Sequence, residues 1–302
     1  MVGNSFIQKN HIVVVLYDLP LFRPPSEAKS VIVQATIGCS HNKCTFCGSY
    51  KMKRFREKSI EEIRKDLRIL REFYPDATRM FLADGNAFCI STEKLLKILK
   101  MAKEIFPKLE RISIYASPTD VLEKSDEEIR TLAENGLKLV YLGVESGDDV
   151  VLREVKKGAT SEEILKAGRK LIENGIKLSV TAILGLGGKR RSEKHAIKTA
   201  KLLNRMKPHY TALLTLIVVE GTPLHKKVLN GEFELLSKEE LLLELRRIVE
   251  LLNYETVFRA NHASNYLPLK AKLPEEKEEL LRTIDYALKH PEILKPDHLR
   301  AL

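Results

Sequence analysis

Short apolar segments alternate with amphipathic helical segments along most of this chain. The apolar segments are rich in β-branched residues, as expected for strands that are buried on both faces. The six predicted strands are residues 31–36, 80–83, 112–116, 139–144, 178–184 and 212–219. The six predicted helices are residues 59–73, 92–105, 125–135, 160–174, 192–206 and 238–252. This alternation predicts an α/β fold whose parallel sheet curls, through right-handed crossovers, toward a barrel.

Local signals mark where the predicted helices begin and end. A capping box, in which a hydroxyl and a glutamate satisfy backbone N–H groups, recurs at Ser59/Glu62, Ser125/Glu128, Thr160/Glu163 and Ser237/Glu240. Residues 134–139 and 173–178 are near copies, and each places Asn-Gly directly before an apolar strand. Asn-Gly is typical of a left-handed helix cap, so short turns are predicted there.

The alternation divides the chain into three regions. Residues 1–30 hold an apolar segment, residues 11–17, and then a proline-broken stretch, which we interpret as a strand-bearing lead-in. Residues 31–220 form the predicted partial (β/α)6 barrel. Residues 221–302 depart from the pattern, with a strand near 256–259 and a helix near 275–288, and we expect a small α/β extension packed on the barrel.

The net charge of +10 permits an anionic partner such as nucleic acid. Most basic residues are spread along the chain, which equally fits an ordinary Lys/Glu-rich surface. A local group either guides an anionic substrate or reductant or belongs to a solvated loop: Lys51, Lys53, Arg54, Arg56 and Lys58. Without an export signal or a membrane-length apolar run, a cytoplasmic protein with no membrane partner is expected.

Three of the four cysteines lie close together, directly after the first predicted barrel strand. Cys39, Cys44 and Cys47 have the spacing Cys-x4-Cys-x2-Cys. Three thiolates this close in sequence can bind one metal centre, but they leave one position of a tetrahedral set unfilled. That position is either filled from elsewhere or left open for a reacting molecule.

Small or polar residues follow the other predicted strands at the corresponding place. They include Asp84, Gly85 and Asn86, then Ser117, then Glu145 and Ser146, then Gly185. Reactive groups collect at the C-terminal ends of the strands in parallel barrels, because all the strand-to-helix loops meet there. The six strand ends therefore predict one shared site that includes the cysteine loop.

This combination resembles the radical S-adenosylmethionine superfamily. The cysteine loop is similar to that superfamily's Cys-x3-Cys-x-aromatic-Cys motif, with Phe46 at the aromatic position and one extra residue between the first two cysteines. Residues 142–149 and 157–160 resemble the branch that contains oxygen-independent coproporphyrinogen oxidases and Elongator-like enzymes. The resemblance covers roughly residues 30–220.

The resemblance implies a [4Fe–4S] cluster on Cys39, Cys44 and Cys47, with S-adenosylmethionine chelating the fourth iron. One electron from a reductant such as ferredoxin or flavodoxin then yields a 5′-deoxyadenosyl radical, which abstracts hydrogen from an unidentified substrate. The implied S-adenosylmethionine-binding residues are Phe46, Asp84, Gly85, Asn86, Ser117, Glu145, Ser146, Lys157, Leu184 and Gly185. Several have plainer alternatives: a turn at residues 84–86, a helix-capping Glu145 and an exposed Lys157.

The segment of residues 258–268 concentrates hydrogen-bonding side chains after a predicted strand. His262 is the leading acid–base candidate there, with Tyr266 as a second catalytic candidate, and the alternative is a polar loop that ties the extension to the barrel. Of the remaining candidates, Cys89 is interpreted mainly as packing, His41 as stabilising the cysteine loop, and His195 as a surface residue.

Two other functions compete with a radical enzyme acting on a small molecule. One is a binding module for nucleic acid or protein, stabilised by zinc on the three cysteines with His41 or Cys89. The other is a radical enzyme that modifies tRNA, although no appended RNA-binding domain is recognisable.

Overall fold

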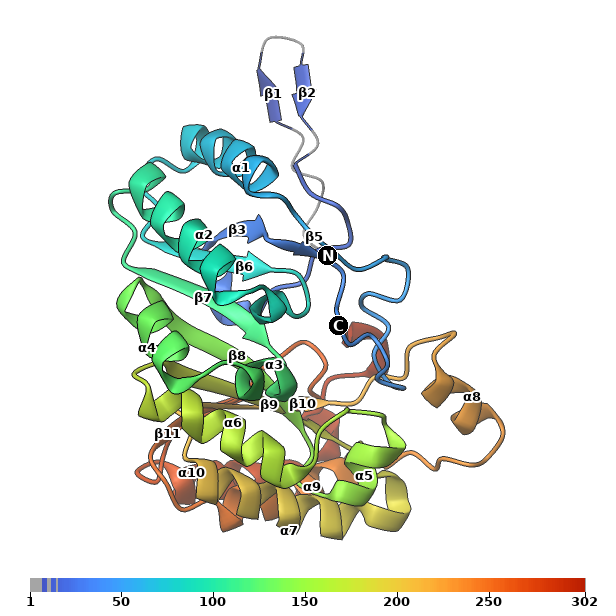
Figure 1. Ribbon diagram of the computed structural model, residues 1–302. Helices are drawn as coiled ribbons and strands as arrows, with labels where there is room; N and C mark the ends of the chain where they lie inside the picture. The colour runs from blue at the N-terminus through green and yellow to red at the C-terminus, as the bar shows by residue number, and fades with distance from the viewer. Residues whose placement is uncertain (1–6, 10–11, 15, 302) are drawn as a thin grey trace.

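The computed structural model describes residues 7–9, 12–14 and 16–301, and one curved sheet dominates it (Figure 1). In spatial order, its strands are β12 (Leu269–Leu273), β11 (Thr256–Ala260), β10 (Tyr210–Thr215), β9 (Lys177–Leu184), β8 (Leu137–Glu145), β7 (Arg111–Ala116), β6 (Arg79–Ala83) and β3 (Val31–Gln34). All neighbours are parallel except the β11–β12 pair, which is antiparallel. The predicted α/β fold with a parallel, partial barrel is therefore confirmed.

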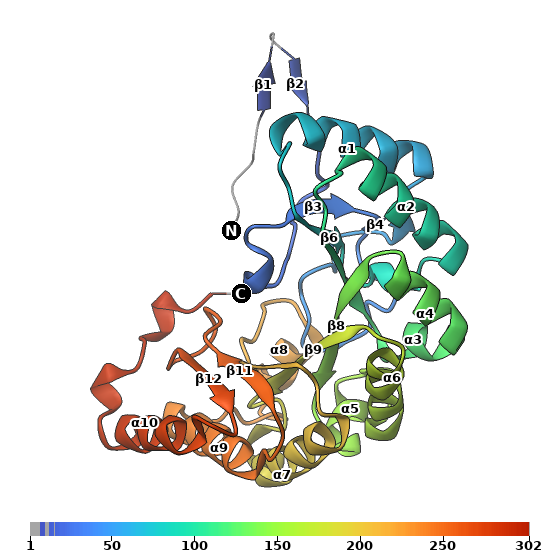
Figure 2. The ribbon, with the colours of Figure 1, turned by 90° about the vertical axis from the view of Figure 1, so that its left-hand side faces the viewer.

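Helices cover the outer, convex side of this sheet (Figure 2). They are α1 (Ile60–Phe73), α2 (Thr92–Ile105), α4 (Asp126–Glu134), α6 (Ser161–Glu173), α7 (Gly188–Met206), α9 (Lys238–Leu251) and α10 (Lys277–Lys289). Three shorter helices lie in loops: α3 (Pro118–Glu123), α5 (Asp149–Glu154) and α8 (Pro223–Leu229). All four predicted capping boxes form, with both reciprocal hydrogen bonds present. In the described part of the chain, no helix is both long and apolar enough to span a membrane.

The three helices that the sequence did not predict are short and lie in loops at one end of the sheet. They are α3, α5 and α8, and each has a Ser, Asp or Thr N-cap that accepts a backbone hydrogen bond. Six or seven residues are too few to show helical periodicity. Their capping residues, and the first-turn prolines of α3 and α8, are the local signals for them.

The C-terminal region continues the sheet. The strand predicted near residues 256–259 is β11, which pairs in parallel with β10, and the unpredicted β12 pairs with β11. At the N-terminus, β1 (Ile7–Lys9) and β2 (Ile12–Val14) form a hairpin, while parts of the predicted lead-in, including residues 10–11 and 15, lie outside the described residues. A further two-stranded sheet joins β4 (Thr36–Ile37) to β5 (Arg56–Glu57) around the cysteine loop.

The two faces of the sheet have different cores. Aliphatic residues fill the space between the outer face and the helices. On the inner face, Phe81 packs edge-to-face against Tyr115 and Tyr141, with ring centroids 4.9 and 5.9 Å apart. The strand registers place these aromatic residues below the C-terminal strand ends. These aromatic rings therefore line the inner face of the sheet beneath the predicted site.

Candidate functional site

Backbone hydrogen bonds from three other loops hold the cysteine loop, residues 38–47, in place. The N–H of Thr45 donates to the carbonyl of Val155 at 2.9 Å, and the N–H of Leu224 donates to the carbonyl of Thr45 at 3.0 Å. The N–H of Gly85 donates to the carbonyl of Gly38 at 3.2 Å. Because these partners follow β8, β10 and β6, the structure brings four strand-end loops together as predicted.

Side chains add to this attachment. His41 Nε2 lies 2.8 Å from the carbonyl oxygen of Lys156, which agrees with the predicted stabilising role of His41. Phe46 packs in a small apolar cluster with Val151, Val155, Leu186, Ile183 and Leu216. Hydrogen bonds and apolar packing thus both hold the cysteine loop in place.

The three cysteines of the loop are free thiols and are half-buried. Burial raises the pKa of Cys44 to about 12, and the positive charge of Lys157 opposes this shift. Burial also raises the pKa of Cys39, although N–H groups of Asn42 and His41 oppose it. The Cys39 and Cys44 thiols therefore keep their protons at neutral pH until a metal displaces them.

No three His, Cys, Asp or Glu side chains among residues 7–9, 12–14 and 16–301 converge on a point that could hold one metal ion.

Asp84 lies beneath the cysteine loop and is fully buried. Its carboxylate accepts hydrogen bonds from the Gly38 N–H at 3.0 Å, from Lys53 Nζ at 3.0 Å and from Gln34 Nε2 at 3.1 Å. Burial raises the pKa of Asp84, and these three donors oppose the shift. With its carboxylate occupied, Asp84 orients the loop rather than presenting a free acid to a ligand.

Two of the five basic residues after the cysteines form internal ion pairs. Lys53 is buried against Asp84, and Lys58 lies 2.7 Å from Asp66 with little exposure. Arg56 pairs with Glu62 on the surface. Neither sequence interpretation, substrate guidance or a solvated loop, fits Lys53 and Lys58, because both cations are buried and paired.

We expect Lys53→Met to destabilise the protein by about 3–5 kcal/mol, because it leaves the buried Asp84 carboxylate without its cation. Guanidinium unfolding of the metal-free protein measures this free energy. Lys97→Met is the matched control, because Lys97 pairs with Glu93 on an exposed helix face and should cost less than about 0.5 kcal/mol. Equal losses in the two variants would contradict the structural role assigned to Lys53.

Asn86 joins two strand ends to the cysteine loop. Its Nδ2 donates to Ser40 Oγ at 2.6 Å, and its Oδ1 accepts from the Ser117 N–H at 3.0 Å. Ser117 Oγ in turn donates to Asp120 at the start of α3. The structure therefore brings Asn86 and Ser117 together. The side-chain hydrogen bonds of both residues go to each other, to Ser40 and to Asp120.

Glu145 and Lys157 form a nearly buried ion pair, with 2.8 Å between Oε1 and Nζ. Burial lowers the pKa of Lys157, but the neighbouring Glu145 and Cys44 together raise it by a larger amount, so the net shift is upward. Glu145 has a positive φ of 61° beside a register shift between β8 and β9. A bulge of this kind redirects a side chain and is common beside active sites. The alternative interpretation of Lys157 as an exposed lysine is therefore wrong.

The sequence did not indicate the role of Gly143. A Cβ atom at this position would stand 2.2 Å from Glu145 Oε1 and 2.8 Å from Lys157 Nζ. A side chain at this position would push the ends of both charged side chains out of their present positions. Gly85 is similar, since its Cβ would stand 2.4 Å from Tyr50 Cε2 and 3.1 Å from Cys39 Cβ.

Ser146 and His195 belong to a buried network. Ser146 Oγ lies 2.7 Å from His195 Nδ1, and His195 Nε2 lies 3.1 Å from the carbonyl oxygen of Ile183. His195 has no exposed surface, so its prediction as a surface residue is wrong; it sits on the inner side of α7, where its ring reaches two hydrogen-bond partners. This network fixes the loop that follows Glu145.

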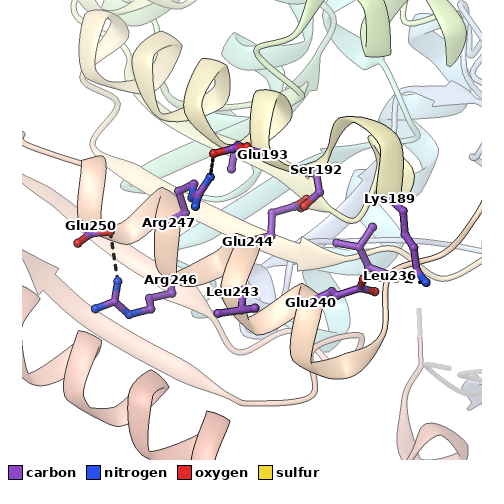
Figure 3. A pocket seen from close by; sticks show the side chains of 11 residues that line it. Lys189, Ser192, Glu193, Leu236, Glu240, Leu243, Glu244, Arg246, Arg247 and Glu250 are labelled. Carbon is purple, nitrogen blue, oxygen red and sulfur yellow. Dashed lines mark hydrogen bonds and ion pairs between the residues drawn. The ribbon is translucent and has the colours of Figure 1, made fainter.

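The same region holds the predicted residues Leu184 and Gly185. Leu184 belongs to the apolar core, and the Gly185 N–H donates to Glu244 Oε1 at 2.6 Å. Glu244 also accepts from Ser192 in a groove of about 370 Å³ between α7 and α9 (Figure 3). The groove lies among the outer helices, so Glu244 links it to the end of β9.

His262 and Tyr266 lie in the segment that follows β11. Tyr266 OH is 2.5 Å from Asp297 Oδ1 and accepts from Arg300 Nη1 at 2.6 Å, while burial raises its pKa to about 12. Ser264 Oγ lies 2.9 Å from His262 Nδ1, and burial lowers the pKa of His262. Arg300 also donates to the carbonyl of Leu216, which anchors this segment at the end of β10.

Comparison with known proteins shows which family this chain is similar to. The sequence model of the Radical SAM superfamily matches residues 33–203. An uncharacterized protein of Methanocaldococcus jannaschii is 28% identical over 226 residues, which is 70% of this chain and 67% of that protein. A putative methylthiotransferase of the same organism is 28% identical over 182 residues, 56% of this chain but only 39% of the relative.

Two solved structures show the same fold. Coproporphyrinogen III oxidase (HemN) from Escherichia coli superposes with a TM-score of 0.55 at 17% identity, over 73% of this chain and 51% of its own. Elp3 from Methanocaldococcus infernus gives 0.53 at 18% identity, over 76% of this chain and 59% of its own. This chain therefore spans only about half the length of these solved chains.

Proposed function

Because this chain belongs to the radical SAM superfamily, we propose that a [4Fe–4S] cluster and S-adenosylmethionine supply it with a 5′-deoxyadenosyl radical that abstracts hydrogen from a substrate. One observation carries this proposal. Three free, half-buried cysteines lie in a loop that three other strand-end loops hold, beside the Glu145–Lys157 pair. The membership in this superfamily confirms the resemblance drawn from the cysteine motif.

The residues present fit these cofactors. Cys39, Cys44 and Cys47 provide three soft ligands, the number that leaves one iron open. Gly85 and Gly143 keep clear two places where any side chain would collide with Cys39 or with the ion pair. Close approach of backbone to a ligand is a common use of such glycines.

The Glu145–Lys157 pair suits the amino-acid end of S-adenosylmethionine, which has one ammonium and one carboxylate. Each charge of the ligand matches one member of the pair, so Glu145 would accept from the ammonium and Lys157 would donate to the carboxylate. Asp84 and Asn86 act here by holding the cysteine loop. The backbone at Leu184 and Gly185, fixed by Glu244, would border the adenine ring.

The proposal predicts a brown protein when it is purified without oxygen, with about four iron and four sulfide per chain. After reduction with dithionite it should release 5′-deoxyadenosine from S-adenosylmethionine, detected by liquid chromatography. A one-electron protein reductant of the ferredoxin or flavodoxin type should replace dithionite. A colourless protein that contains zinc, or a loaded protein that leaves S-adenosylmethionine intact, would contradict the proposal.

A further inference from the structure

Tyr50 has a buried hydroxyl without a hydrogen-bond partner in the part of the chain that the structure describes. The residue is only 6% exposed. A buried tyrosine hydroxyl normally has a partner, so an unpaired one indicates that something else supplies it. Two other buried polar atoms lack partners there, but they lie in α2 and at the start of β7, away from the cysteine loop.

The ring of Tyr50 is held on several sides, so its hydroxyl has a defined position. Phe22 packs edge-to-face against it at 5.5 Å between centroids, and Lys53 Nζ lies 5.8 Å from the ring centre. Its Cε2 atom and Cys39 Cβ both lie within 3.1 Å of the point where a Cβ of Gly85 would stand. Tyr50 therefore lies directly beside the first of the three cysteines.

A tyrosine hydroxyl is a hydrogen-bond donor at neutral pH, because its ordinary pKa is about 10. The Tyr50 hydroxyl has no acceptor among the described residues. Asp84 already accepts from three donors, whereas Cys39 and Cys47 lie close enough to Tyr50 to influence it electrostatically. An iron–sulfur centre on these cysteines would bring further sulfur acceptors to the same place.

We propose that Tyr50 is a positioning residue whose hydroxyl donates a hydrogen bond to a sulfur of the assembled iron–sulfur centre. This inference rests on the proposed function and adds a residue that sets the electron affinity of the centre. A hydrogen bond to a cluster sulfur stabilises the reduced form, which has one more negative charge, and so raises the reduction potential.

The test compares the wild type with Tyr50→Phe, which keeps the ring and removes only the hydroxyl. Both proteins are loaded with iron and sulfide without oxygen and titrated with dithionite in the absence of S-adenosylmethionine. The reduced fraction is read by electron paramagnetic resonance. At one fixed ambient potential, the ratio of reduced to oxidised cluster should fall severalfold in the variant, with unchanged iron content.

Tyr254→Phe is the matched control, because Tyr254 is also a buried tyrosine, but its hydroxyl lies 2.7 Å from Thr211 Oγ1 near the start of β10. Its reduced-to-oxidised ratio should equal that of the wild type. Equal ratios for cluster-loaded wild type and Tyr50→Phe would overturn this assignment alone, as would a difference that appears only after S-adenosylmethionine is added. A wild-type protein that assembles no cluster would overturn the proposed function and this assignment together.

Discussion

Replacing Cys44 by alanine is expected to abolish cluster retention, whereas replacing Cys89 is expected to leave it intact. Cys44 lies in the loop that is bonded to Val155 and Leu224 through Thr45, so its thiol is held where two other thiols are near. Two remaining thiolates cannot keep a cluster that needs three. Loss of iron should be at least tenfold, measured as iron and sulfide per chain after anaerobic desalting.

Cys89 provides the matched control because it is also a half-buried free thiol beside the loop. Burial, together with the charge of Asp120, raises its pKa to about 12, and a hydrogen bond with Ser40 opposes the shift. Its alanine variant should keep the wild-type iron content. Cluster loss in Cys89→Ala would show that Cys89 is a ligand, and retention in Cys44→Ala would show that Cys44 is not.

The fold was predictable because its signals are local. Each long helix has a capping box or an apolar stripe that its own residues define, and each central strand is a continuous apolar run. β12 was missed because its alternating Lys270 and Lys272 face outward at a sheet edge, which gives a polar pattern in an otherwise unmarked loop. Edge strands carry weaker sequence signals than buried ones.

The sequence predicted which strand ends form the site, but not how the side chains there are arranged. Residue type and position brought Asp84, Asn86, Glu145 and Ser146 to the right edge of the sheet, but not the direction of each side chain. Asp84 turns beneath the loop to Lys53, which is distant in sequence, and Ser146 turns to His195 on α7. Such pairings depend on tertiary contacts that no local pattern contains.

The bulge in β8 shows the same limit. A regular strand places alternate residues on one face, but the register shift at Gly143 and Glu145 and the positive φ of Glu145 break that alternation. The sequence named Glu145 and Lys157 separately, as two S-adenosylmethionine-binding candidates. Their pairing, and the need for glycine beneath them, follow only from the folded geometry.

Gly143→Ala should therefore impair S-adenosylmethionine binding while preserving the cluster. The added methyl group would stand 2.2 Å from Glu145 Oε1 and 2.8 Å from Lys157 Nζ, so the ion pair must move. A displacement of about 1 Å in a positioning group can reduce a rate about 100-fold. We expect a loss of that order in 5′-deoxyadenosine formation, with weaker binding of S-adenosylmethionine in equilibrium dialysis.

Gly175→Ala separates this effect from the general cost of adding a methyl group. Gly175 follows α6, away from the strand-end loops, and no atom lies within 4 Å of its added Cβ, although its φ of +83° makes the change mildly destabilising. Gly175→Ala should lose about 1 kcal/mol of stability and bind S-adenosylmethionine normally. Normal binding by Gly143→Ala as well would mean that S-adenosylmethionine does not use the Glu145–Lys157 pair.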